Sequence, residues 1–409
     1  MEGVLWTRMV CSWIFICAFL NARAAPPGSQ CSERLSGDDF VEKLRAHGIK
    51  EADDPLRGKC KAPGPDFPDP QLEGEQHTVS VQLEPGGQPV PMKYRIQRGT
   101  GEMKNPRKTV VYFPGGPGPS SNHPRDIHHA PADADVILLD YPGLGENKDV
   151  KVSNPDHAYS MRGAGRYAMA VIAQLQNAGD KSIGDNYTLY GLSYGTTAAT
   201  VTASMLSKQD KIKKPKGVFL DAVVGTVMTP PDTMKAATDK VWALVPEDMR
   251  AKVKAKFAEV TSVTGQTRTH EMLDFLFGAP AGNPNAEEAK TYYQWLLNSA
   301  NEDILGCAMA LIKKGQVASN HRPSAYCEFI NNGTPDNGNY GDLLPDSIPA
   351  MCKCSPSKIK GSWNAAEHPV KDIPLFFRNG GADDLTTTAQ AQTACSTQTC
   401  TTTPFYEYT

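Results

Sequence analysis

Two short apolar runs constrain the fold class of this chain more than any other feature. Residues 109–113 (TVVYF) and 135–140 (DVILLD) are nearly unbroken apolar segments of strand length. Half-solvated strands alternate apolar and polar residues, whereas continuous apolar strands are typical of parallel sheets that are buried on both faces. The two runs therefore predict a buried, mostly parallel sheet.

Helical patterns separate these runs from two further apolar segments, YTLYG and GVFLD. Tyr167, Val171 and Leu175 recur at helical spacing, and Gly179 stands where a helix would end. A second helical pattern then leads to residues 217–221. Strands that alternate with helices of this length form βαβ units. We therefore predict an α/β fold with a doubly wound, mostly parallel sheet.

The chain of 409 residues is long enough for one large α/β domain that carries an insertion. The segments HTVSVQL and MKYRIQR predict an antiparallel strand pair ahead of the parallel strands. After GVFLD the strand signals fade and helical patterns such as TYYQWLL dominate, until DIPLFFRNGG and PFYEY predict strands again. The predicted parts are a signal peptide (1–24), an N-terminal extension (25–75), a first α/β core segment (76–225), a helical cap insertion (226–368) and a second core segment (369–409).

The N-terminus has the pattern of a secretory signal. Arg8 leads into an apolar run at residues 13–20, and small residues at Ala22 and Ala24 suit a cleavage site. The alternative is a membrane anchor, but the run is shorter than the roughly 20 residues that span a bilayer. We therefore expect a secreted, extracellular protein with no membrane attachment once the signal is removed.

The cysteines agree with an oxidising compartment. Removal of residues 1–24 leaves an even set of eight, which suggests disulfides. Cys31 with Cys60 and Cys395 with Cys400 are candidate pairs, although spacing alone leaves the connectivity open. A zinc site at residues 352–354 is disfavoured, because no histidine or second close cysteine pair lies nearby. The eight are Cys31, Cys60, Cys307, Cys327, Cys352, Cys354, Cys395 and Cys400.

The charge balance of the chain disfavours two classes of binding partner. The chain has 45 acidic and 42 basic residues, with no basic stripe and no acidic tail. Such a balanced surface disfavours nucleic acids and anionic membranes as partners.

The strongest local motif is Gly191-Leu-Ser193-Tyr-Gly195, between a predicted buried strand and a helix. Flanking glycines relieve the crowding of a sharp turn that exposes a serine hydroxyl at the sheet edge. The following helix would place its positive end near a developing oxyanion. The alternative is a glycine-rich turn with an ordinary serine.

A second motif, Pro114-Gly-Gly-Pro-Gly118, follows the strand TVVYF. Glycines in this position let the backbone approach a substrate and direct N–H groups at it. Pro117 has no N–H, so Gly116 is the better oxyanion donor, acting with the N–H of Tyr194. By itself, the cluster is also compatible with a simple turn.

Five segments in order give the chain a family resemblance. VVYFPGGPGPSS, DVILLDYPGLGEN, YGLSYGTTAA, GVFLDAVVG and IPLFFRNGGADDLTT resemble the α/β-hydrolase family of proline iminopeptidases and secreted tripeptidyl aminopeptidases. The resemblance implies an α/β-hydrolase fold with Ser193 as nucleophile, Gly116 and Tyr194 as oxyanion donors, and Asp384 as the triad acid, with Asp383 as the competing choice. It implies no metal or organic cofactor. Where the family has arginine and serine in the second segment, this chain has Pro142 and Asn147, so the pairing that the arginine makes in relatives must be replaced.

The predicted triad lacks its base. In the α/β-hydrolase order the histidine follows the acid, but the last histidine, His368, precedes Asp384. We expect a chain truncated before that histidine; the alternatives are a protein that has lost its base and substitution by a loop histidine. Those loop histidines are His123, His128 and His129. Loss of a triad member costs on the order of 10⁴ to 10⁶ in turnover, so the chain as given is predicted to be nearly inactive.

The resemblance predicts a secreted serine aminopeptidase that cleaves residues from the N-termini of peptide substrates through an acyl-enzyme. An esterase or lipase on the same scaffold is the first alternative, because the same turn and oxyanion loop serve any acyl transfer. A binding protein that keeps the fold without the triad is the second.

Overall fold

In the computed structural model the chain divides into two units. The first unit is Met1–Asp66, Thr229–Ser319 and Gly333–Ser355, and the second is Phe67–Met228, Asn320–Asn332 and Pro356–Thr409. The described residues are 37–53, 60, 74–100, 108–116, 121, 132–178, 183, 186–224, 243–264, 286–313, 328, 365–380, 386–398 and 405–408. The predicted signal peptide lies outside them, and the predicted domain boundaries stay a prediction.

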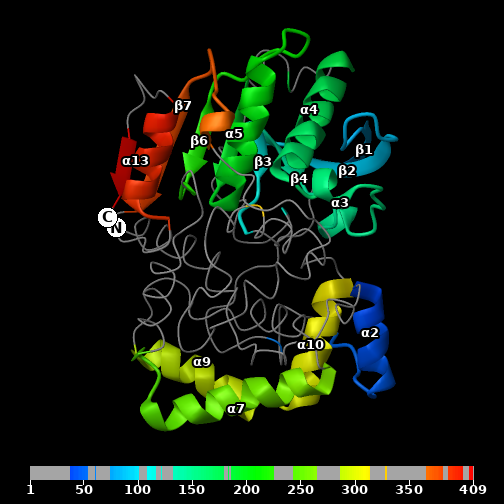
Figure 1. Cartoon of the computed structure of the whole chain (residues 1–409), viewed down its shortest axis with the longest axis vertical. Helices are drawn as coiled ribbons and strands as arrows, with labels where there is room; N and C mark the ends of the chain where they lie inside the picture. Colours follow the sequence, from blue (N-terminus) through cyan, green and yellow to red (C-terminus); the bar gives the residue numbers. More distant parts are fainter. Residues whose placement is uncertain are drawn as a thin grey trace. The chain divides into compact units, whose positions relative to one another are not determined.

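An eight-stranded sheet forms the second unit, with strand order β1-β2-β4-β3-β5-β6-β7-β8 (Figure 1). The strands are β1 Glu75–Val81, β2 Val90–Gln97, β3 Lys108–Phe113, β4 Ala134–Leu139, β5 Tyr187–Leu192, β6 Val218–Asp221, β7 Leu375–Gly380 and β8 Phe405–Tyr408. All pairings from β4 to β8 are parallel, whereas β2 is antiparallel to both β1 and β4. The predicted mostly parallel α/β sheet and its antiparallel strand pair are confirmed.

Burial explains why the apolar runs became strands. Every residue of β4 is buried, as are the last three residues of β3, which lies in the middle of the sheet. By contrast, β7 alternates buried and half-buried residues along its length. Continuous apolar sequence thus marks the strands with two covered faces, as expected of a parallel sheet.

Three helices cover the same face of this sheet. Each of α4, α5 and α13 crosses from one strand to a parallel strand further along the same direction, so the right-handed crossover rule assigns them one side. They follow one another along the sheet in Figure 1. Helix α4 packs closely on α5: a Cβ on Gly165 would lie 2.8 Å from the Sδ of Met205. The described helices are α2 Gly37–Ala46, η4 Gly145–Asn147, α3 Pro155–Ala158, α4 Met161–Asn177, α5 Tyr194–Ser207, α7 Glu247–Thr264, α9 Ala286–Asn298, α10 Asn301–Lys313, η5 Ala365–Glu367 and α13 Thr388–Thr397.

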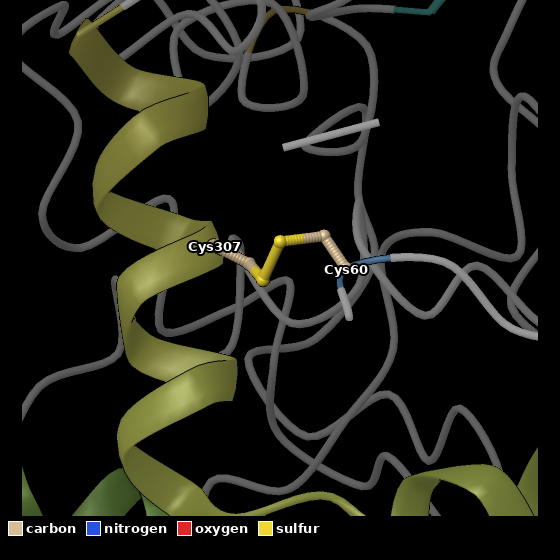
Figure 2. The surroundings of a disulfide bond; sticks show 2 residues. All are labelled: Cys60 and Cys307. Carbon is tan, nitrogen blue, oxygen red and sulfur yellow. A yellow bond between two sulfur atoms is a disulfide. The ribbon is translucent and has the colours of Figure 1, made fainter. Parts of the chain in front are cut away.

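Within the first unit, the N-terminal segment packs against helix α10. The N–H of Ala52 donates to the carbonyl of Gly306 over 3.1 Å, and a Cβ on Gly306 would lie 2.4 Å from the carbonyl oxygen of Lys50. A disulfide joins Cys60 to Cys307 on α10 (Figure 2). The N-terminal segment and α10 therefore belong to one packed structure.

This disulfide corrects the two pairings suggested by spacing. Cys60 is bonded to Cys307 and not to Cys31, although the two bonded residues are 247 positions apart. Cys395, near the end of α13, is a free thiol and not the partner of Cys400. For Cys60, close spacing failed because the packing of the N-terminal segment on α10 brings it to a cysteine that is distant in the sequence.

None of the described helices is long and apolar enough to cross a membrane.

Candidate active site

Ser193 occupies the sharp turn between β5 and α5, where sequence reasoning placed the nucleophile. Its backbone has φ 49° and ψ −118°, an unfavourable conformation for a residue with a side chain. Ser193 is 1% exposed, and its hydroxyl has no hydrogen-bond partner within the described part of the chain. A strained backbone and an unpaired buried hydroxyl both cost free energy, and such costs are concentrated at functional sites.

Gly191 and Gly195 permit this turn. A Cβ on Gly191 would lie 2.5 Å from the carbonyl oxygen of Gly195, and a Cβ on Gly195 would lie 2.1 Å from that of Phe113. Real Cβ atoms do not approach so closely, so only glycine fits at either position. The contact with Phe113 also brings the carboxyl end of β3 directly against the first turn of α5.

The predicted oxyanion donors come from these two elements. Gly116 follows the end of β3 and has φ 124°, which only glycine adopts readily. Tyr194 is the first residue of α5 and is buried. The close contact between Gly195 and the backbone of Phe113 and Pro114 brings the loop of Gly116 next to Tyr194.

Tyr141 supports both sides of this junction. Its ring meets the ring of Tyr194 edge to face, with 5.8 Å between the ring centroids. Its hydroxyl donates to the carbonyl of Pro114 over 3.3 Å. Burial, and then the neighbouring Asp140 carboxylate, raise the pKa of the Tyr141 hydroxyl well above its usual value. The hydroxyl therefore stays protonated and remains a donor to the loop.

The segment that leaves β6 holds the Ser193 turn from the other side. The N–H of Ser193 donates to the carbonyl of Asp221 over 2.8 Å, and the N–H of Val224 donates to the Thr196 hydroxyl over 3.2 Å. Ala222, between them, has a φ of 53° and donates its N–H to the carbonyl of Arg378 on β7. Backbone hydrogen bonds thus link the turn after β5 to the end of β6, and the segment after β6 to β7, next to the candidate nucleophile.

The predicted acid, Asp384, and its competitor Asp383 lie outside the described residues, but both ends of their loop are described. Asn379 on β7 is fully buried and accepts the N–H of Val223 over 2.7 Å through its side-chain oxygen. Its amide nitrogen donates to the carbonyl of Thr386. One side chain therefore links the exit of β6, the end of β7 and the residue two positions after Asp384.

Sequence reasoning missed the buried carboxylate of Asp221. One oxygen, Oδ2, accepts the Tyr190 hydroxyl over 2.7 Å and pairs with the guanidinium of Arg378. The other oxygen, Oδ1, is buried with no hydrogen-bond partner in the described part of the chain. The available signal was an aspartate that ends an apolar strand, GVFLD, because the carboxyl ends of parallel strands meet at one edge.

Glu328 belongs to the predicted cap insertion, and no sequence pattern singled it out among the acidic residues there. Glu328 is 4% exposed and accepts the N–H of Met161 at the start of α4 over 2.9 Å. The sulfur of Met161 accepts the hydroxyl of Thr197, in the first turn of α5, over 3.1 Å. The buried carboxylate of Glu328 is therefore linked through Met161 to α5, the helix that follows Ser193.

The described histidines do not supply the missing base. None of them is hydrogen-bonded to the Ser193 hydroxyl. His368 precedes β7 and so lies toward its amino end, whereas Ser193 follows the carboxyl end of the parallel strand β5. Burial lowers the pKa of His368 to about 4, helped by the positive charges of Arg162 and Lys208. The loop histidines at residues 123–129 lie outside the described residues.

The departure at Pro142 and Asn147 has a structural account. Asn147 is fully buried, and its amide nitrogen donates to the carbonyls of Asp140 and Lys93 over 2.7 and 2.9 Å. Its side-chain oxygen accepts the N–H of Lys93 over 2.7 Å. Asn147 thus ties β2 to the end of β4 and closes the loop that contains Pro142.

No group of three or more histidine, cysteine, aspartate or glutamate side chains is arranged to hold a metal ion in the part of the chain that is described.

Comparison with known proteins gives one family match. The family model described as "alpha/beta hydrolase fold" matches residues 108–279. None of the curated proteins compared matches the chain. Among solved structures, an esterase from Exiguobacterium antarcticum is similar at 13% identity, covering 81% of this chain and 90% of its own, with a TM-score of 0.37. An esterase from Rhodococcus sp. ECU1013 is similar at 15% identity, covering 82% and 90%, with a TM-score of 0.36. A bromoperoxidase from Bacillus anthracis is similar at 11% identity, covering 81% and 91%, with a TM-score of 0.33.

Proposed function

The chain has the α/β-hydrolase fold, and from this premise we propose that it is a serine hydrolase whose nucleophile is Ser193. The observation that carries the proposal is the Ser193 turn itself. A buried hydroxyl without a partner in the described chain sits on a strained backbone between a central strand and a helix N-terminus. If Ser193 had only a structural role, the fold would be more stable with a favoured φ at this residue and a hydrogen bond to its hydroxyl.

In the proposed reaction the Ser193 oxygen attacks an acyl carbonyl and forms a carbon–oxygen bond. The proton of the hydroxyl passes through a base to the leaving amine or alcohol as the scissile bond breaks, and water then releases the acyl group by the reverse path. The N–H groups of Gly116 and Tyr194 would hold the oxyanion. Asp384 would orient the imidazole of a histidine base.

The finer proposal is a secreted exopeptidase that removes residues from peptide N-termini. It rests on the family resemblance of the five sequence segments and on a carboxylate suited to a free amine. An aminopeptidase needs such an anion near the scissile bond. Glu328 accepts the N–H of Met161 at the start of α4, and the sulfur of Met161 contacts Thr197 in the first turn of α5. The Cys60–Cys307 disulfide supports secretion, because disulfides persist in oxidising compartments.

A fluorophosphonate probe tests the serine hydrolase directly. We expect the protein from its natural source to be modified at Ser193, and Ser193→Ala to abolish the modification. Failure to label Ser193 in the folded protein would favour the noncatalytic binding protein.

Paired substrates then separate peptidase from esterase. The proposal expects an aminoacyl arylamide to be cleaved and its N-blocked counterpart to be resistant, and it expects Glu328→Gln to raise KM for the free amine. Equal cleavage of the free and blocked substrates, or preference for a simple ester, would identify an esterase instead.

A further inference from the structure

Thr196 makes three hydrogen bonds, and two of them go to a single peptide group, that of Ser193 and Tyr194. Its backbone N–H and its hydroxyl both donate to the carbonyl oxygen of Ser193, over 2.8 and 2.6 Å. The same hydroxyl accepts the N–H of Val224 over 3.2 Å. Thr196 is 1% exposed, so water does not compete for these bonds. The Thr196 hydroxyl, acting as both donor and acceptor, thus links the Ser193 turn to the segment that follows β6.

The peptide group that Thr196 binds is the one that carries the proposed oxyanion donor. The carbonyl of Ser193 and the N–H of Tyr194 belong to the same planar, trans unit and point in opposite directions. Fixing the carbonyl oxygen therefore fixes the direction of the Tyr194 N–H. Hydrogen bonds to a carbonyl also polarise its peptide group, which strengthens the N–H as a donor.

Other threonines in α5 show that this arrangement is more than helix back-bonding. Thr197, Thr200 and Thr202 also donate their hydroxyls to carbonyls three or four residues earlier. Those carbonyls belong to α5 itself, whereas that of Ser193 lies in the strained turn ahead of the helix. Thr196 is also the one whose hydroxyl receives a backbone N–H from the β6 exit.

We infer that Thr196 is a positioning residue that aims the Tyr194 N–H at the oxyanion. The inference rests on the proposed function, since it assigns Thr196 a role in the oxyanion site of that same serine hydrolase. Thr196 does not touch the reacting atoms; it acts through the Ser193–Tyr194 peptide. An oxyanion is held most strongly in the transition state, so the role predicts an effect on the rate of reaction and not on substrate binding.

Three variants test this role in the full-length protein. Thr196→Val removes the hydroxyl and keeps the shape, and Thr196→Ser keeps the hydroxyl. Thr202→Val is the matched control, because Thr202 is fully buried on the same helix and donates to the carbonyl of Ala198 over 2.8 Å. For each, the second-order rate constant of phosphonylation by a fluorophosphonate is measured against pH, together with the melting temperature.

The inference expects Thr196→Val to lower the rate constant about 10-fold, below the 10² to 10³ lost when an oxyanion donor is itself removed. Thr196→Ser and Thr202→Val should stay within about 3-fold of the parent. Thr196→Val should lose more stability than Thr202→Val, because it also leaves the buried N–H of Val224 without its acceptor. The pH midpoint should not move, because the base is untouched.

Equal rate constants for Thr196→Val and Thr202→Val would overturn the inference, as would a loss caused by a shifted pH midpoint. If Thr196→Val does not fold, Thr196→Ala carries the same expectation against Thr202→Ala. A parent protein that folds but is never labelled at Ser193 would instead refute the proposed function, so the two failures are distinguishable.

Discussion

The N–H of Ser193 lies 2.8 Å from the carbonyl oxygen of Asp221, so the last residue of β6 holds the turn that carries the candidate nucleophile. This bond ties the Ser193 turn to the adjacent parallel strand. The strained φ of Ser193 is therefore maintained by the sheet and not by the turn alone.

Gly195→Ala should destabilise the protein strongly. The new Cβ would lie 2.1 Å from the carbonyl oxygen of Phe113, and this backbone atom has no side-chain freedom with which to move aside. We expect a loss of about 3 kcal/mol or more in the free energy of unfolding, at the upper end of overpacking effects. Denaturant titration measures it.

Gly86→Ala is the control for this substitution. Gly86 has φ +74° and nothing within 4 Å of an added Cβ, so only backbone strain of about 1–2 kcal/mol is expected. A loss at Gly195 no larger than that at Gly86 would mean that β3 and α5 do not pack as described.

Asn379→Asp should weaken both stability and reactivity. One oxygen of the new carboxylate can still accept the N–H of Val223. The other oxygen replaces the amide nitrogen, so an acceptor then faces the carbonyl oxygen of Thr386, which is also an acceptor. An unsatisfied buried acceptor costs about 1–3 kcal/mol. Thr386 lies at the end of the loop that contains Asp384. The repulsion should therefore disturb the position of the proposed triad acid and lower the rate of Ser193 phosphonylation.

Asn147→Asp separates these two effects. Asn147 is equally buried and donates its amide to the carbonyls of Asp140 and Lys93, far along the sheet from β7. We expect a similar loss of stability with a smaller change in phosphonylation rate. The role given to Asn379 is wrong if both variants change the rate equally.

Loss of the Cys60–Cys307 disulfide should destabilise the first unit by about 2–5 kcal/mol, the usual range for a native disulfide. A Cys60→Ser, Cys307→Ser double variant tests this by thermal melting. Cys395→Ser is the control, because Cys395 is a free thiol. If the double variant melts with the parent, or if peptide mapping finds Cys60 joined to another cysteine, this packing is refuted.

Stability should fall as the pH drops from about 6.5 toward 4, in part through His368. Burial and the charges of Arg162 and Lys208 lower the pKa of His368 from 6.5 to about 4. In this window the unfolded chain binds a proton that the folded chain does not, so the stabilisation present above pH 6.5 is lost as the pH falls. Its size is roughly 1–2 kcal/mol after allowance for solvent screening.

His368→Gln should remove that part of the pH dependence. Melting temperatures of the parent and the variant, measured between pH 7 and pH 4, give the comparison. Parallel curves for the two proteins would show that His368 keeps an ordinary pKa in the folded state.

Local sequence patterns predicted much of the sheet but few of the contacts around Ser193. The buried runs that became β3 and β4, and the Gly-x-Ser-x-Gly motif around Ser193, are visible because each is a short pattern of residues close in the chain. The partners of the turn are not visible in this way. Asn379 reaches Val223 across 156 positions, and Glu328 reaches Met161 across 167. Such pairs depend on where β6 and β7 come to lie and on which acidic residue meets α4.

If Ser193 is an activated nucleophile, a fluorophosphonate should modify it, and site mapping of the adduct is the decisive measurement. The full-length protein from its natural source is treated with the probe at neutral pH, digested, and analysed by mass spectrometry beside a heat-denatured sample. We expect one modified peptide, with the adduct on Ser193, and none after denaturation. A folded protein that stays unmodified, or that is modified at another serine, would contradict it.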